Sequence, residues 1–391
     1  MRLATASLLG LAALACSART SVRQAEAPRE PFTFVSRLGD HQHSFVGNAV
    51  ALDAAGNALV AGATDGVAPG QRSLGGWDAL VVKFAPGGAL QWVRQLGTDG
   101  DDAARCVAVA PDGDALVGGS LGESPFAARL DPSGNVRWLK RLADAGPGAD
   151  AIAAIAVDGR GEVTTSLGST VLHLDERGET LWTAPFFGGE VAASCVAVDE
   201  AGNAAVAGGR PFYSSDGREH GAALAVARLG AGGATLWRLE VDESELRGGA
   251  FVEPRAIVVD AVSGDLVVAG RSVATREPGA PRSGFVARFS PEGQLRWVMQ
   301  LPQADLPVDA LAVGERGNIH VAGELGSRGL YVAAFDAAGT FGSMLEYATQ
   351  LHNEARGIAV GREGVYVTGS MDARAEGGAR PRGGVLALIK L

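Results

Sequence analysis

The chain has 391 residues and a formal net charge of −10. The acidic balance argues against a nucleic-acid partner, because proteins that bind nucleic acids carry basic patches. No apolar run approaches the roughly 20 residues that a membrane-spanning helix needs. Glycine is abundant, at 56 residues, which indicates many tight turns.

Residues 1–15 are predicted to be an export signal. Arg2 precedes the apolar run of residues 3–15, as in the charged and apolar segments of a secretory signal. Residues 17–31 are polar and contain proline. We therefore expect residues 16–31 to form a flexible tether.

Cys16 is the candidate site of lipid attachment. It follows the small residue Ala15, and the segment resembles a bacterial lipoprotein signal. That resemblance implies a lipid-modified Cys16 at the mature N-terminus. With Ser17 after it, the resemblance implies the outer membrane, on its periplasmic side or at the cell surface. Residues 13–15 also fit ordinary A-x-A cleavage, which would instead release a secreted protein.

From residue 32 onward the sequence repeats a unit of four short strands. Residues 106–142 show it best, as the runs CVAVA, DALVGGS, FAARLD and NVRWLKRL separated by turn residues. These runs are too short for helices and are rich in residues that favour strands. A single sheet of this kind has two faces to bury, so it needs neighbours.

The repeat count predicts a closed ring. The first strand recurs seven times, as AVALD, CVAVA, AIAVD, CVAVD, AIVVD, ALAVG and GIAVG. The last fourth strand is missing at the C-terminus, whereas residues 32–39 are similar to residues 90–97 and precede the first copy. We therefore expect an all-β fold, a single seven-bladed β-propeller of four-stranded antiparallel blades over residues 32–391. The N-terminal strand would complete its last blade.

The residues just before the first strands form the candidate binding site. Six of these seven positions are polar and should line one mouth of the channel: Asn48, Arg105, Ser194, Arg255, Asp309 and Arg356. The seventh is Ala153. The three arginines could hold an anionic group. Pairing with Asp102, Glu253 and Glu354 would make them structural, and we favour that interpretation.

The predicted loops differ between the two faces of the disc. Turns from first to second and from third to fourth strands are short and alike. Loops from second to third strands are long and dissimilar: residues 65–77, 210–221, 274–284 and 372–383. Because function usually resides on loops held by a rigid scaffold, the variable loop face is the predicted binding surface.

No catalytic set is evident. His41, His43 and His352 could form a metal site, although surface histidines are the simpler interpretation. The aspartates of the D-x-x-G turns are expected to cap local amides. Cys106 and Cys195 occupy equivalent positions in non-adjacent blades, so we expect buried thiols rather than a disulfide. We expect no enzyme activity, no cofactor and no bound metal.

The repeat resembles a known bacterial family. DAAGNALVAGAT, followed by WDALVVKFAPGGALQWVRQLG, is similar to the seven-bladed SBBP repeat. That resemblance covers most of residues 32–391 and implies a secreted or cell-surface protein without assigned activity. LDPSGNVRW, at residues 130–138, also resembles the tryptophan-docking motif of quinoprotein-type propellers. This second resemblance implies a tryptophan packed between neighbouring blades.

We therefore predict a non-enzymatic exported propeller scaffold, anchored in the envelope through Cys16. It would be a monomer that binds an envelope or extracellular protein or a glycan through its variable loop face, with the lipid as its membrane contact. Two alternatives are a quinoprotein-like or other channel-centred enzyme and a structural component of outer-membrane assembly.

Overall fold

The computed structural model describes residues 32–38, 43–142, 150–213, 219–242, 251–273, 275, 282–301, 305–326, 329–348, 353–372 and 382–389. The chain divides into two units, Met1–Pro31 and Phe32–Leu391, and the described residues all belong to the second. Cys16, His41, His352 and parts of three long loops lie outside the described residues. Within the described part, no helix is long and apolar enough to cross a bilayer.

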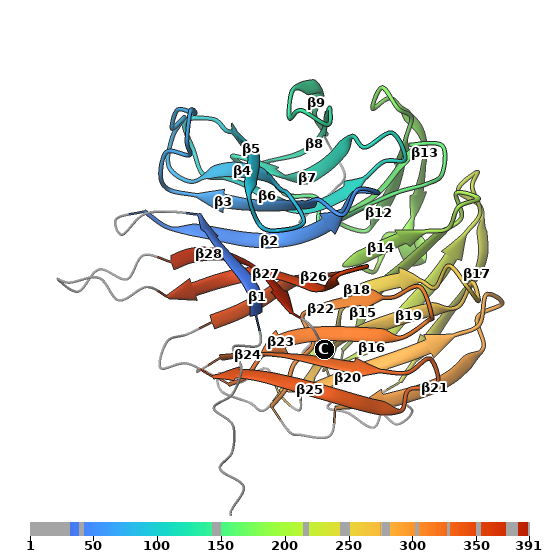
Figure 1. The fold of residues 1–391 in the computed structure, drawn as a ribbon. Coiled ribbons are helices and arrows are strands. Elements are labelled where there is room, and N and C mark those ends of the chain that lie inside the picture. The colour runs from blue at the N-terminus through green and yellow to red at the C-terminus, as the bar shows by residue number, and fades with distance from the viewer. Residues whose placement is uncertain are drawn as a thin grey trace, which may run out of the picture. The chain divides into compact units, whose positions relative to one another are not determined.

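The second unit is built from antiparallel sheets in which strands adjacent in sequence are neighbours (Figure 1). The first sheet contains β2 (Phe45–Leu52), β3 (Ala58–Thr64), β4 (Asp78–Phe84) and β5 (Leu90–Leu96). The second contains β6 (Asp102–Val109), β7 (Ala115–Leu121), β8 (Ser124–Leu130) and β9 (Val136–Arg141). The third contains β10 (Ala154–Val157), β11 (Val163–Leu167), β12 (Thr170–Leu174) and β13 (Thr180–Pro185). A short 3-10 helix, η1 (Phe186–Gly189), follows β13.

The next eight strands form one sheet made of two antiparallel groups. One group contains β14 (Cys195–Val198), β15 (Ala204–Tyr213), β16 (Glu219–Leu229) and β17 (Thr235–Val241). The other contains β18 (Phe251–Val259), β19 (Leu266–Val273), β20 (Arg282–Phe289) and β21 (Leu295–Gln300). In the described residues a single parallel pair, Ala222 with Phe251, joins the two groups.

The C-terminal strands form two more sheets, and the last includes the first strand of the fold. One sheet contains β22 (Ala310–Val313), β23 (Ile319–Glu324), β24 (Gly329–Phe335) and β25 (Phe341–Ala348). The other contains β26 (Asn353–Gly361), β27 (Gly364–Asp372), β28 (Arg382–Ile389) and β1 (Phe32–Leu38). β1 runs antiparallel to β28, with Leu38 opposite Gly384.

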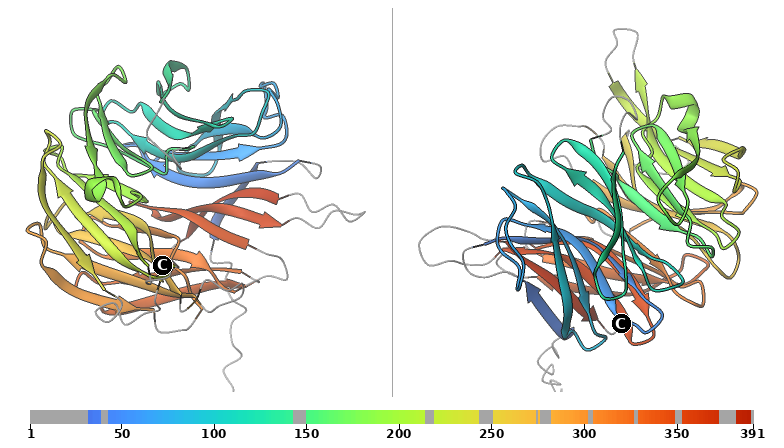
Figure 2. Two further views of the ribbon diagram at one scale, coloured as in Figure 1. Left: turned by 180° about the vertical axis from the view of Figure 1, so that it is seen from behind. Right: turned by 90° about the horizontal axis from the view of Figure 1, so that it is seen from above.

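Hydrophobic cores lie between successive sheets. Leu59 of β3 packs in a core with Phe126 of β8, whereas the next residue, Val60, packs in a core with Tyr366 of β27. Consecutive strand residues point to opposite faces, so β3 is buried on both sides by different neighbours. Figures 1 and 2 show β2 of the first sheet beside the strands of the last. Further cores connect the intervening sheets in chain order.

In several sheets, a tryptophan forms a hydrogen bond to the sheet that follows. Trp92 Nε1 donates a hydrogen bond to the Pro132 carbonyl oxygen at 2.9 Å. Its ring covers the turn at Gly134, where a Cβ would lie 2.7 Å from the indole, so glycine is required for this close approach. The bond recurs from Trp138 to Glu176, from Trp182 to Ala231 and from Trp237 to Pro291. The packing implied by the motif at residues 130–138 is therefore present.

Candidate functional site

A cavity of about 1240 Å³ lies where the first strands of the sheets converge. Every candidate residue predicted from the sequence lines it, and so does Ala153: the polar residues are Asn48, Arg105, Ser194, Arg255, Asp309 and Arg356. They come from sheets spread along the whole described chain. The structure thus brings together residues up to 308 positions apart, as in the hydrogen bond from Arg356 Nη1 to Asn48 Oδ1 at 3.0 Å.

Four of the six residues lie inside their strands rather than before them. The pairing register skips one residue in each of β2, β6, β18 and β26: Asn48, Arg105, Arg255 and Arg356. Each is therefore the extra residue of a β-bulge, which leaves the ladder and re-aims its side chain. Ser194 and Asp309 do precede their strands, because β14 and β22 are shorter. The expected position was thus wrong for the four residues in longer strands.

A glycine on the second strand makes room for each bulge. A Cβ at Gly119 would lie 2.0 Å from the Ala103 carbonyl oxygen, and one at Gly270 would lie 2.2 Å from the Glu253 carbonyl oxygen. Real Cβ atoms do not approach a backbone oxygen this closely. Glycine therefore determines where the bulge forms and which residue faces the cavity.

Two of the three arginines are engaged with carboxylates. Arg356 Nε lies 2.8 Å from Glu354 Oε2, and Arg255 Nη2 lies 3.2 Å from Glu253 Oε2. Glu253 also accepts from Arg271 Nε at 2.7 Å. The structural pairing predicted for Arg255 and Arg356 is thus present.

The pairing predicted for Arg105 is wrong. Asp102 is buried, and its carboxylate accepts from the backbone amides of Thr98 and Gly122 at 2.6 and 2.7 Å. Within the described chain, Arg105 forms no ion pair and its side chain is exposed at the cavity. Asp102 pairs with Leu121 before the bulge at Arg105. The bulge adds one residue between them and the rest of the strand, so the Asp102 side chain points into the protein while Arg105 faces the cavity.

Carboxylates outnumber bases in the cavity lining. The three arginines face six acids: Asp150, Glu190, Glu253, Asp309, Glu324 and Glu354. Three positive and six negative charges give the lining a formal net charge of −3. Two arginines outside the lining, Arg210 and Arg271, pair with Glu190 and Glu253. The acids still exceed the bases when these two are counted, so the cavity suits a cationic group better than an anionic one.

Asp309 is a cavity carboxyl with a raised pKa. Burial raises the pKa of Asp309 to about 6, with Arg271 lowering it and Glu324 raising it. Its backbone amide donates to the Ala322 carbonyl oxygen at 2.9 Å, which fixes the residue just before the start of β22. Asp309 therefore changes charge close to neutral pH.

Cys106 and Cys195 also line the cavity. Both are free and buried, and burial raises the pKa of each thiol to about 12. The thiolate, rather than the thiol, is the nucleophile and the metal ligand. These cysteines therefore act as small packing residues in the cavity wall.

No protein-family model matches the sequence, and the comparison with curated proteins finds no match. Among solved structures, the chain is similar to Raptor from Chaetomium thermophilum, with a TM-score of 0.60 and 10% identity over 92% of this chain and 29% of that one. It is also similar to a chain of the Mitotic Checkpoint Complex, with a TM-score of 0.57 and 12% identity over 100% of this chain and 99% of that one. At these identities the likeness shows the fold alone, which is all-β and propeller-like.

Proposed function

We propose that this chain is a seven-bladed β-propeller of the SBBP-repeat type that binds a partner and catalyses no reaction. Ring closure is supported by the pairing of β1 with β28 and by the core that Tyr366 shares with Val60. In a closed propeller the first strands of the blades surround the central channel. Seven equivalent residues around one cavity fit that arrangement.

The observation that carries the binding function is that the cavity opens on the face of the second-to-third strand connections. Tyr213, in the variable loop of residues 210–221, lines the cavity, and so does Gly168 in the short turn between β11 and β12. Glu190, which follows η1, lines it as well. Tyr213 is 63% exposed, and exposed aromatic residues are enriched in binding interfaces. A partner seated on these loops would reach the cavity.

The charge of the cavity narrows the class of partner. A lining of −3 favours a basic segment of an envelope or extracellular protein, or an amino-bearing glycan. Arg105, which has no ion pair in the described chain, would contact an acidic group at the edge of such a segment. The anionic ligand considered from the sequence fits less well, because Arg255 and Arg356 already bind carboxylates.

An enzyme with its active site in the channel would use Asp309 as its general acid or base. A carboxyl with a pKa of about 6 suits proton transfer near neutral pH. A nucleophile in the same cavity would have to be Cys106 or Cys195, and burial keeps both protonated. We therefore propose binding rather than catalysis.

The test is capture of the partner from crosslinked envelope fractions with charge-reversed bait. Asp150 and Glu190 are exposed lining residues, so Asp150→Lys with Glu190→Lys should leave the fold intact. Glu292→Lys, in the short turn after β20, is the matched control. We expect wild type and the control to recover the same partner and the double variant to lose it. Equal recovery by all three baits would contradict the proposal.

We further propose that Cys16 carries a lipid that holds the protein in the outer membrane. The proposal rests on the sequence of residues 1–17. Its test is the intact mass and membrane fractionation of wild type beside Cys16→Ala. A lipid-sized increment that disappears in the variant, together with membrane association, is expected. An unmodified soluble wild-type chain would show that the protein is freely secreted.

A further inference from the structure

Acid–base pairs recur at the same place in several sheets. Near the end of the third strand, a buried lysine or arginine reaches an aspartate in the turn between the first and second strands. Lys83 Nζ lies 2.9 Å from Asp53 Oδ2, and Arg129 Nε lies 2.7 Å from Asp114 Oδ2. Equivalent pairs are Arg228 with Asp199 and Arg288 with Asp260. In each of these sheets a permanent cation neutralises a carboxylate at the turn.

The third sheet departs from this pattern. His173 occupies the place of Lys83, since each lies opposite the tryptophan of the fourth strand, Trp182 and Trp92 respectively. The turn keeps its aspartate, Asp158. The turn ends in a second acid, Glu162, where the first sheet has Asn57 and the group β14–β17 has Asn203. The second sheet and the group β18–β21 have Asp114 and Asp265 at this position. Two carboxylates thus face an imidazole, which is not permanently charged.

No other base compensates these acids within the described chain. Neither Asp158 nor Glu162 forms an ion pair with a lysine or arginine there. Asp158 is 4% exposed and His173 is 2% exposed. Burying carboxylate charge without a compensating cation is costly. The second sheet and the group β18–β21 also have two acids at this turn, but two arginines compensate them there. The third sheet has the two acids without any such permanent cation among the described residues.

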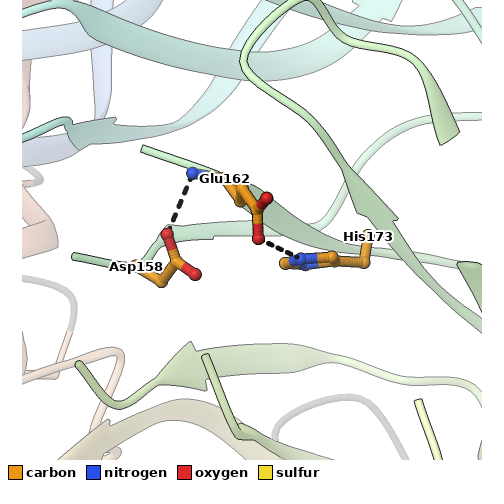
Figure 3. Close-up of side chains that lie close together, drawn as sticks. All are labelled: Asp158, Glu162 and His173. Atoms are coloured by element: carbon orange, nitrogen blue, oxygen red, sulfur yellow. Dashed lines mark hydrogen bonds and ion pairs between the residues drawn. The ribbon is translucent and has the colours of Figure 1, made fainter. Parts of the chain in front are cut away.

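The three side chains converge as metal ligands do (Figure 3). Their donor atoms all lie within 4.8 Å of one another. His173 Nε2 is 3.2 Å from Glu162 Oε2, about the ligand separation around a tetrahedral ion with bonds of roughly 2.0–2.1 Å. Asp158 Oδ1 accepts from the amides of Arg160 and Glu162, both at 2.9 Å, which leaves Oδ2 available for an ion.

The neighbours of His173 hold the ring in the required orientation. Thr164 Oγ1 lies 2.9 Å from His173 Nδ1. A bond from Nδ1–H to this hydroxyl leaves the Nε2 lone pair directed at the carboxylates, as second-shell partners of metal-bound histidines do. Trp182 stacks on the imidazole, with ring centroids 5.0 Å apart. Contacts with Thr164 on β11 and Trp182 on β13 therefore hold the His173 ring in the orientation that metal binding needs.

From this arrangement we propose that Asp158, Glu162 and His173 bind a divalent transition-metal ion, with Zn²⁺ as the best match. One imidazole and two carboxylates suit zinc, whereas Mg²⁺ and Ca²⁺ prefer all-oxygen sites. A divalent ion neutralises both carboxylates. It joins the turn to the third strand, as Lys83 and Arg129 do in their sheets. The sequence had indicated no metal, because Asp158 was interpreted only as a turn former.

The test uses the full chain, stripped with a chelator and titrated with Zn²⁺ against a chromophoric competitor, with Tm measured alongside. Wild type should bind one ion at this site with a rise in Tm. His173→Arg and Glu162→Asn each restore the residue type of other sheets, so both should fold and lose that ion. Thr164→Val should weaken binding about 10- to 100-fold.

His43→Ala is the control, because His43 is half-exposed and remote in sequence. It should leave the bound ion and the Tm shift unchanged. Undiminished binding to both His173→Arg and Glu162→Asn would overturn the proposal, as would loss of the ion in His43→Ala. Failure of Zn²⁺, Co²⁺ and Mn²⁺ alike to raise the Tm of wild type would also overturn it.

Discussion

Arg129 and Trp138 donate hydrogen bonds to the same backbone oxygen, that of Glu176 in the next sheet. The distances are 3.4 Å from Arg129 Nη1 and 2.8 Å from Trp138 Nε1. The two residues are opposite each other on β8 and β9, so one cross-strand pair provides both donors. The same pairing of a base with tryptophan recurs in other sheets: Lys83 with Trp92, His173 with Trp182, Arg228 with Trp237 and Arg288 with Trp297.

The pair is lost as a unit in one sheet. At the equivalent positions of β24 and β25, Ala334 lies opposite Ser343. Neither side chain can reach a carbonyl of the sheet that follows. In the sheets compared, the base and the tryptophan are thus present together or absent together. The contact between β22–β25 and β26–β28 relies on apolar packing.

Asp114 allows a buried and an exposed arginine to be compared on one carboxylate. Arg129 and Arg137 both place Nε 2.7 Å from Asp114 Oδ2, but the Arg129 side chain is 5% exposed and that of Arg137 is 53% exposed. Arg129→Met should lower the free energy of unfolding by about 1.5–3 kcal/mol, because buried Asp114 loses one of its two charged hydrogen-bond donors. Arg137→Met should change it little, since exposed ion pairs contribute little. Urea denaturation measures both, and equal losses would contradict this assignment.

The bulge at Arg105 depends on Gly119. Gly119→Ala should push the chain away from the Ala103 carbonyl oxygen, which a Cβ would approach to 2.0 Å. We expect a loss of more than about 1 kcal/mol of unfolding free energy, because the added methyl has no space. Gly87→Ala is the control, since a Cβ there meets nothing within 4 Å. Chemical denaturation of the two variants should separate them clearly, and similar midpoints would show that the bulge tolerates a side chain.

Asp309 should make stability depend on pH. Burial raises the pKa of Asp309 from 3.8 to about 6 in the folded state. Between pH 3.8 and 6 the folded state binds more protons than the unfolded state. The stabilising contribution of Asp309 is therefore fully present below pH 3.8 and is lost as the pH rises through 6. Asp309→Asn should therefore be more stable than wild type above pH 6, by at most about 3 kcal/mol. Its advantage should shrink toward pH 4.

Tm measured from pH 4 to 8 tests this expectation. Glu292→Gln removes an exposed acid in a short turn and serves as the control. Its difference from wild type should stay constant across the range. A constant difference for Asp309→Asn as well would show that this carboxyl does not titrate with a raised pKa.

The pairing of β1 with β28 should contribute to the stability of the whole unit. Deleting residues 32–38 removes a strand that pairs along β28 from Gly384 to Ile389. The deletion exposes a strand edge, which costs stability and promotes association. Deleting residues 17–30 should leave Tm unchanged. Thermal unfolding and size-exclusion chromatography of both deletion variants check this expectation. Equal Tm values and elution profiles for the two variants would mean that β1 contributes nothing to stability.

The sequence repeat predicted the strand pattern and the residues around the cavity, because turn residues and short apolar runs are local signals. It could not place Asp102, whose inward direction follows from the bulge at Arg105. That bulge depends on a contact between Gly119 and Ala103 on neighbouring strands. The excess of acids in the cavity was also missed, since Glu190 and Glu324 come from loops and strand ends that periodicity does not bring together.

The cluster of Asp158, Glu162 and His173 did have a sequence signal. A histidine stands where other repeats have lysine or arginine, and a glutamate stands where they have asparagine or aspartate. Aligning the third strands of the repeats against their turns would have revealed both substitutions. The signal is visible only once the pairing of Lys83 with Asp53 shows what that position does.

The most direct test of the central claim is photo-crosslinking in cells from a single position on the variable loop face. A photoreactive phenylalanine analogue at Tyr213, which lines the cavity and is 63% exposed, should yield one discrete adduct with a partner. The same analogue at Leu236, which is 59% exposed on the outer strand β17, is the control and should yield none. An adduct at Leu236 without one at Tyr213 would contradict binding through the cavity face.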